Sequence, residues 1–400
     1  MKKILFTLFI FLISISNVFG LELNTYSKNV LLYDLTDDTM LYSVNSDEKA
    51  PIASLTKIMT SLVAINYIDN LNEGIVITNS DLKGLVEQNA SVAGFKVGEK
   101  VTYEDLLYGL LLPSGADAAL SLVHNTYKSE DSFISKMNEL ATTIGLENTH
   151  FASVTGLDTD GNYSTVSDLV KLLKYAINNP TFYKIFTSKD YITSDLSLKF
   201  QSSLSYNADK YNLNLSYVTG SKTGTTDDAG LCLVTLAENN GTKYILATLG
   251  APKSYKTPYN LLDAVTIYSY FFDNYEYRTI FKTGDIITTL KTKNALESKI
   301  DIKADNDIKI FMDKNIDLNN LKYVYDGENI INYNTDIGTK LGTLSILYND
   351  KNLKNVDIVL NQKLHFNYFY ILGIIVLLLI ILKLRINHKR KLKKRRRLKR

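Results

Sequence analysis

The sequence predicts an α+β domain, followed by a small all-β domain and one membrane-spanning helix. Three observations support this prediction. Helical and strand patterns mix up to about residue 272, only short alternating stretches follow, and a long apolar run precedes a basic C-terminal tail. Because strand patterns stand at both ends of the first region, with helical patterns between them, we expect one antiparallel sheet covered by helices.

The first 20 residues have the order of a secretory signal peptide. Lys2 and Lys3 precede an almost wholly apolar run from Ile4 to Ile15, and a short segment then leads to Gly20. This order predicts a signal peptide at residues 1–20, with cleavage after Gly20. The alternative is an uncleaved anchor helix.

The first domain is expected to cover residues 21–274. It begins with a hairpin, because residues 29–36 and 40–44 alternate around a polar turn. Apolar residues at helical spacing follow at 54–68, 103–127, 131–145 and 165–178. Strand patterns and a closing helix complete the domain, at 214–219, 229–237, 243–250 and 258–274 respectively.

The second domain is expected to cover residues 275–363 and to be all β. Clusters of Asp, Asn, Gly and Lys separate its short alternating stretches, at 285–292, 299–304, 307–313, 321–325, 341–348 and 355–360. The domain offers no constellation of catalytic side chains, so we interpret it as a spacer or scaffold.

The C-terminal end has the composition of a membrane anchor. The run from Phe366 to Leu384 is apolar apart from two residues, and as a helix it would span about 28 Å, close to the thickness of a hydrocarbon core. We assign residues 364–384 to a transmembrane helix. Residues 383–400 contain 12 Lys or Arg and no acid. Because basic segments beside a span stay in the cytoplasm, residues 385–400 form a cytoplasmic tail and the domains lie outside the cell.

Charge and rare residue types exclude several classes of function. The net charge of +3 hides an acidic exported part, because without the tail and the signal lysines 31 basic residues face 42 acids. An acidic surface disfavours a nucleic-acid partner. With one cysteine, Cys232, and four histidines, we expect no internal disulfide, no metal and no cofactor. Catalysis is left to hydroxyls, lysines and carboxylates.

Ser54 and Lys57 are candidates for a nucleophile and its base. They stand three positions apart at the start of an apolar-periodic stretch, so one helical turn brings their side chains together. A serine needs an adjacent base to attack at neutral pH. A lysine inside a helical core supplies one, because burial disfavours its charged form. Taken alone, the pair is equally consistent with a serine that caps a helix.

Two further Ser-x-x-Lys copies are not expected to be catalytic. Ser46 and Lys49 lie in a polar loop, and Ser80 and Lys83 lie in another polar stretch. In both places the lysine would remain solvated and protonated, which leaves the serine without a base.

Two later motifs complete a candidate site. Ser114 lies at a turn between two apolar helical stretches, where its hydroxyl either enters a cleft or caps a helix. The segment Lys222-Thr223-Gly224 follows a predicted strand and offers an ammonium, a hydroxyl and a glycine that allows close approach of a substrate backbone. A second Lys-Thr-Gly, at residues 282–284, is interpreted as a turn.

In this order, the three motifs resemble the low-molecular-weight penicillin-binding proteins, the D-alanyl-D-alanine carboxypeptidases of peptidase family S11. The resemblance extends to residues 148–151, 156–158, 162–165 and 338–342 and to the anchor. It implies the transpeptidase fold shared by penicillin-binding proteins and β-lactamases. It also implies a serine-type hydrolase of the bacterial cell membrane that removes the terminal D-alanine from peptidoglycan stem peptides during cell-wall biogenesis and cell-shape control, and that β-lactams acylate.

The resemblance implies three catalytic residues. Ser54 is the nucleophile that attacks the carbonyl between two D-alanines, and Lys57 is its general base. Ser114 relays protons to the leaving amine, with Lys222 beside it. Water then releases the shortened peptide.

The resemblance also implies four substrate-binding residues, which are Lys222, Thr223, Gly224 and Thr225. Backbone N–H groups of Ser54 and Thr225 form the oxyanion hole. The hydroxyls of Thr223 and Thr225 hold the terminal carboxylate of the substrate.

Two positions depart from the family's pattern. The second motif usually ends in Asn, whose amide contacts the substrate and the lysine, but here the residue is Ala116. The family also often has an arginine near the last strand of the sheet, and no arginine precedes Arg278. Lys253 or Lys256 would have to bind the carboxylate without the bidentate fork of arginine.

Three other activities remain as alternatives. A class A-type β-lactamase would need a glutamate-activated water, and the sequence has no suitable Glu-x-x-x-Asn loop. A catalytically impaired binder of penicillin or peptidoglycan is suggested by Ala116 and the missing arginine. A DD-endopeptidase that cuts cross-links would use the same residues as the carboxypeptidase.

Overall fold

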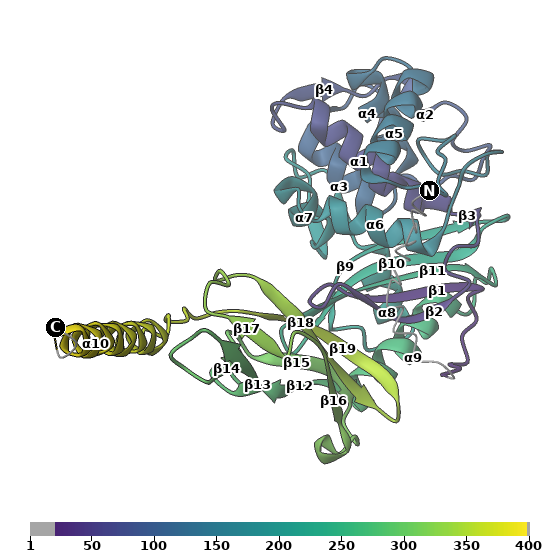
Figure 1. Ribbon diagram of the computed structural model, residues 1–400. Helices are drawn as coiled ribbons and strands as arrows, with labels where there is room; N and C mark the ends of the chain where they lie inside the picture. Colours follow the sequence, from purple (N-terminus) through teal and green to yellow (C-terminus); the bar gives the residue numbers. More distant parts are fainter. Residues whose placement is uncertain (1–20, 398–400) are drawn as a thin grey trace, which may run out of the picture. The chain divides into compact units, whose positions relative to one another are not determined.

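The computed structural model describes residues 21–397, and the chain divides into two compact units with a boundary between Asp273 and Asn274. In Figure 1 the N-terminal unit runs from purple to teal, and the second unit from green to yellow. The signal peptide predicted at residues 1–20 lies outside the described residues.

A five-stranded antiparallel sheet forms the centre of the N-terminal unit, in the order β2-β1-β11-β10-β9. Its strands are β1 (Asn29–Asp34), β2 (Thr39–Val44), β9 (Val218–Thr226), β10 (Gly230–Asn239) and β11 (Thr242–Ala251). The register pairs Asn29 with Leu249 and Asp34 with Tyr244, so the first strand completes a sheet whose last three strands come near the end of the same unit. The predicted hairpin and the single antiparallel sheet are both confirmed, and β9 lies at a sheet edge.

Helices cover the two faces of this sheet, with α6 on one side and α9 on the other (Figure 1). The helical elements of this unit are η1 (Ala53–Leu55), α1 (Thr56–Tyr67), α2 (Asn79–Leu82), α3 (Tyr103–Leu111), α4 (Ala116–Thr126), α5 (Glu130–Ile144), α6 (Val166–Ala176), α7 (Pro180–Phe186), α8 (Ser203–Lys210) and α9 (Tyr259–Asn274). Helix α1 is the central one, because Ile58, Met59 and Leu62 are almost completely buried and it contacts five other helices, α3 to α7.

The helix predicted over residues 103–127 is two helices. It breaks between α3 and α4, where Pro113 has no backbone N–H to donate and Ser114 adopts a left-handed backbone with φ 70°. Gly115 is required at the break, because a Cβ there would lie 2.6 Å from the Asp117 carboxylate. The break therefore lifts Ser114 out of the helix, at the turn that the sequence predicted.

The second unit contains a β-rich domain, as predicted. Its strands are β12 (Tyr275–Phe281), β13 (Ile286–Lys293), β14 (Lys299–Lys303), β15 (Ile308–Asp313), β16 (Lys322–Gly327), β17 (Ile330–Asn332), β18 (Lys340–Tyr348) and β19 (Lys351–Val359). They form small sheets around a core that includes Leu290, Ile331 and Ile346. The Lys-Thr-Gly at 282–284 is a turn, since Gly284 has φ 90° and donates to Ala304 O at 2.8 Å.

The C-terminal helix α10 (Phe369–Arg397) follows the β-rich domain. Residues 369–394 are long and apolar enough to cross a membrane, by length and composition. The helix begins five residues after the predicted start at 364, because the preceding segment pairs with the β-rich domain: Leu296 N–H donates to His365 O and Asn367 N–H to Asn294 O. It also continues beyond residue 384 into the basic tail, since arginine and lysine are good helix formers.

Candidate active site

Ser54 and Lys57 lie side by side at the start of α1. Ser54 is in the 3₁₀ turn η1, directly before the helix, and Lys57 is in the first turn of α1. The Lys57 Nζ atom is 2.9 Å from Ser54 Oγ, within hydrogen-bond distance. Ser54 is partly exposed while Lys57 is only 2% exposed, so the hydroxyl is accessible and the amine is not.

Burial lowers the pKa of Lys57 to about 7, because a charged amine loses its hydration inside the core. The negative charge of Asp117 acts in the opposite direction and is the smaller effect. An amine with this pKa is substantially deprotonated near neutral pH. It can then accept the proton of the adjacent hydroxyl, which is what activation of a serine requires.

The segment 153–157 holds the Lys57 amine from the other side. The amine donates to the backbone oxygen of Thr155 at 2.5 Å. Gly156 makes this possible, because it has φ 74° and a Cβ at this position would lie 2.1 Å from Ala53 O. No role for this segment follows from the sequence alone. Its one sign in the sequence is a glycine after Thr155, and single glycines are common in ordinary turns.

A second lysine–serine pair lies on the other side of the site. Lys222 Nζ donates to Ser114 Oγ at 2.8 Å and to Thr223 O at 2.8 Å. Lys222 is 1% exposed, and burial, followed by the charge of Lys57, holds the pKa of its amine well below the usual value. The two lysines thus have partners of the same two kinds, a serine hydroxyl and a backbone carbonyl.

Strand β9 brings this second pair to the first. A Cβ on Gly224 would lie 3.0 Å from Ala53 Cβ and 3.2 Å from the Ser54 backbone nitrogen, so any side chain at residue 224 would push β9 and η1 slightly apart. The strand was predicted to end at residue 219, before the motif. It instead begins at Val218 and contains the whole motif, because Lys222 and Thr223 pair with β10.

Ala116 is buried in the core at the first position of α4 and presents no polar group to the site. Its neighbour Asp117 is also buried, and its carboxylate accepts hydrogen bonds from the backbone N–H groups of Ala93, Gly94 and Phe95. Asp117 therefore organises a neighbouring segment and does not replace the missing amide.

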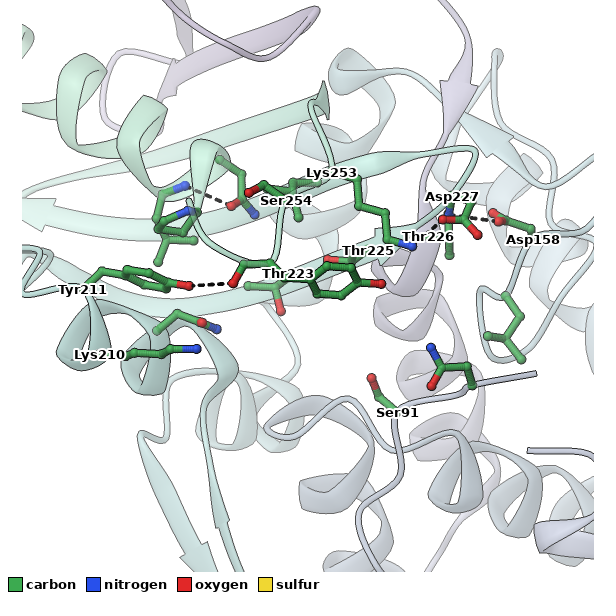
Figure 2. A pocket seen from close by; sticks show the side chains of 18 of the residues that line it. Ser91, Asp158, Lys210, Tyr211, Thr223, Thr225, Thr226, Asp227, Lys253 and Ser254 are labelled. Atoms are coloured by element: carbon green, nitrogen blue, oxygen red, sulfur yellow. Dashed lines mark hydrogen bonds and ion pairs between the residues drawn. The ribbon is translucent and has the colours of Figure 1, made fainter. Parts of the chain in front are cut away.

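A cavity of about 590 Å³ lies against β9 (Figure 2). Thr223 and Thr225 line it, whereas Ser54, Lys57, Ser114 and Lys222 are not among its lining residues. Of the two lysines proposed to replace the arginine, Lys253 lines the cavity and Lys256 does not. The Lys253 ammonium forms an ion pair with Asp227 at the end of β9.

Comparison with known proteins gives a consistent result. A family model described as D-alanyl-D-alanine carboxypeptidase, peptidase S11, matches residues 20–253, and one described as penicillin-binding protein 5, C-terminal domain, matches residues 275–365. The chain is 30% identical to the D-alanyl-D-alanine carboxypeptidase DacF of Bacillus subtilis, over 81% of this chain and 82% of the relative.

Solved structures resemble the same regions. The Streptomyces K15 DD-transpeptidase is 33% identical, with a TM-score of 0.56, and the match covers 62% of this chain and 98% of that one. Penicillin-binding protein 5 of Haemophilus influenzae has a TM-score of 0.67 over 86% of this chain and 99% of its own. At 24% identity, the second likeness supports the fold alone.

Proposed function

The chain belongs to the D-alanyl-D-alanine carboxypeptidases of peptidase family S11, and we propose that it removes the terminal D-alanine of peptidoglycan stem peptides through an acyl-enzyme on Ser54. The family and the serine carboxypeptidase activity that the three motifs predicted are confirmed. The observation that carries the assignment of Ser54 is its hydroxyl 2.9 Å from the amine of a buried lysine.

In the acylation step, neutral Lys57 takes the hydroxyl proton of Ser54 as the oxygen attacks the carbonyl between the two D-alanines. Backbone N–H groups of Ser54 and Thr225 stabilise the negative charge that develops on the carbonyl oxygen. The carbon–nitrogen bond then breaks. The proton that Lys57 took from Ser54 passes through Ser114 to the leaving amine of D-alanine, which returns Lys57 to its neutral form. Lys222 hydrogen-bonds to the relay oxygen.

In the deacylation step, water attacks the ester that joins the peptide to Ser54. Lys57 takes a proton from the water, and the Ser54 oxygen leaves and regains a proton. The same buried amine acts twice as a base, so both steps require its neutral form. β-Lactams acylate Ser54 by the first step, and slow release makes them inhibitors.

Strand β9 supports substrate binding because it is an edge strand, with backbone groups free to pair with an extended peptide. Thr223 and Thr225 hold the terminal carboxylate of the substrate. Lys253 takes the place of the missing arginine as the cation that binds this carboxylate. Its ion pair with Asp227 would have to open for a carboxylate to replace it.

We further propose that the enzyme is exported by the signal peptide at residues 1–20 and anchored by α10. The apolar part of α10 is consistent with one crossing of the membrane, and its basic end is consistent with a cytoplasmic tail. The residues before α10, from 21 onwards, then lie outside the cell, where peptidoglycan is. Protease treatment of intact protoplasts should remove the catalytic unit and spare the tail; a protected catalytic unit would contradict this orientation.

Release of D-alanine from a pentapeptide ending in D-Ala-D-Ala tests the proposed activity. Purified protein should release one D-alanine per peptide, and Ser54→Ala should not. If fluorescent penicillin labels Ser54 but no D-alanine appears, the protein is a binder and not a carboxypeptidase. Rapid turnover of nitrocefin would instead indicate a β-lactamase.

A further inference from the structure

The segment 88–91 forms a second wall of the cavity, opposite β9. Gln88, Asn89 and Ser91 all line the cavity and are exposed to it. In Figure 2 the Ser91 hydroxyl points into the space between this segment and the strand that carries Thr223. Within residues 21–397, neither the Asn89 amide nor the Ser91 hydroxyl has a hydrogen-bond partner in the protein, so both groups are available to a ligand.

The position of this wall is fixed by α4. The Asp117 carboxylate accepts three backbone N–H groups from residues 93–95, at 2.8 to 3.2 Å. In addition, the Ala116 N–H donates to the backbone oxygen of Ser91 at 2.8 Å. Ser91 is therefore held directly beside Ala116, on the helix whose preceding turn presents Ser114 to Lys222.

A peptide bound in this cleft has two edges of backbone groups. One edge can pair with β9, which lies at an edge of the sheet. The other edge faces away from β9, and its N–H and C=O groups lose water when the peptide binds, which is unfavourable unless the protein replaces those hydrogen bonds. Ala116 cannot do so, because a methyl side chain has neither a donor nor an acceptor.

We propose that Ser91 and Asn89 bind the backbone amide of the acyl part of the substrate, on the edge away from β9, in place of the amide absent at Ala116. The ligand class is a secondary amide adjacent to the scissile bond, as in a peptide or in the acylamino side chain of a penicillin. This inference rests on the proposed acylation of Ser54.

Comparing acylation by two β-lactams, one with and one without the amide, tests the contact that Ser91 and Asn89 are proposed to make. Benzylpenicillin has an acylamino side chain, and 6-aminopenicillanic acid has the same ring and carboxylate without it. Ser91→Ala and Asn89→Gly are each expected to lower the second-order rate constant for benzylpenicillin about fivefold, the loss of one neutral hydrogen bond, and to change the constant for 6-aminopenicillanic acid less than about twofold. Glycine is used at Asn89 because this residue has φ 49°.

Glu87→Ala is the matched control, since Glu87 is exposed in the same turn but does not line the cavity. It should leave both rate constants unchanged. An equal loss for both compounds in the Ser91 and Asn89 variants, or no loss for either, would overturn the proposal. If neither compound acylates the unmodified protein, the proposed function fails instead, so the two failures are distinguishable.

Discussion

The Ser54–Lys57 and Ser80–Lys83 segments have the same spacing and opposite surroundings. Lys57 is buried with its amine against Ser54 and Thr155, whereas Lys83 is exposed. The Ser80 hydroxyl is not paired with its lysine but lies 2.7 Å from Thr78 Oγ1, at the start of the four-residue helix α2. Of these two copies, the amine lies against the hydroxyl only where the lysine is removed from water, and for this reason we assign the nucleophile and the base to Ser54 and Lys57.

The third copy supports the same conclusion. Ser46 hydrogen-bonds to Asp47, and the exposed Lys49 lies over the ring of Tyr163. In both copies the lysine is exposed, as the polar surroundings in the sequence predicted.

Removing the serines should separate the copies most strongly. Ser54→Ala is expected to lower acylation by about 10⁴-fold or more, because no other hydroxyl can take its place as nucleophile. Ser80→Ala and Ser46→Ala should label normally with fluorescent penicillin. Loss of labelling in either of these two variants, with Ser54→Ala unaffected, would reverse the assignment.

Removing the lysines should give the next largest difference. Lys57→Ala is expected to slow acylation by benzylpenicillin about 10²- to 10⁴-fold, the usual contribution of a general base. Lys83→Ala is the control and should have no measurable effect on the acylation rate. Equal rates in the two variants would show that burial of Lys57 does not serve catalysis.

Gly156 tests whether the second partner of Lys57 matters. Gly156→Ala forces a Cβ to within 2.1 Å of Ala53 O, so the Thr155 carbonyl must move away from the amine. We expect acylation to fall about 10- to 100-fold, as for a misplacement of about 1 Å near the reacting groups.

Gly161→Ala controls for backbone strain in that experiment. Gly161 also has a left-handed backbone, φ 85°, but its nearest neighbour to a new Cβ is 3.7 Å away. The Gly161→Ala variant should have a lower melting temperature, because alanine is strained at a positive φ, but it should still be acylated at the normal rate. If both variants acylate at the same rate, the 153–157 segment does not position the lysine.

The pH dependence of acylation should report the amine of Lys57. Its pKa is lowered to about 7 by burial, and only the neutral form is a base. The rate should therefore rise with pH, about tenfold between pH 6 and pH 8, and then level off. Stopped-flow measurement with a chromogenic β-lactam would show this; a rate that falls over the same interval would contradict the assignment.

Lys253 and Lys256 allow a similar comparison between two lysines, and the expected effect is smaller. Only Lys253 lines the cavity, so Lys253→Ala is expected to raise KM for the pentapeptide about 3- to 10-fold, which corresponds to the free energy of one typical hydrogen bond. Lys256→Ala should leave KM unchanged. The opposite pattern would move the carboxylate-binding cation to Lys256.

Much of the fold follows from local patterns in the sequence. The hairpin β1–β2, helices α1, α5 and α6 and the pair β10–β11 appear at the predicted places, because their apolar periodicity coincides with burial in one core. Short elements were missed. Helix α7 has an Asn179 cap and Pro180 at its first position, but its seven residues are too few for a clear period.

The site was predictable in its residues and less so in its contacts. The three motifs contain the residues of both lysine–serine pairs, because activation of a serine requires a nearby base. The carbonyl of Thr155 and the wall at residues 88–91 could not be found in this way, because both act through tertiary placement: the first uses a backbone atom, and the second is held by Asp117 from another element.

The direct measurement is the titration of the Lys57 amine, by NMR of protein labelled with ¹³C at the lysine side chains. The Lys57 signal, identified by its absence in Lys57→Ala, is expected to titrate near pH 7. A signal that titrates near pH 10, the value of a solvated lysine, would contradict the conclusion that burial prepares this amine to deprotonate Ser54.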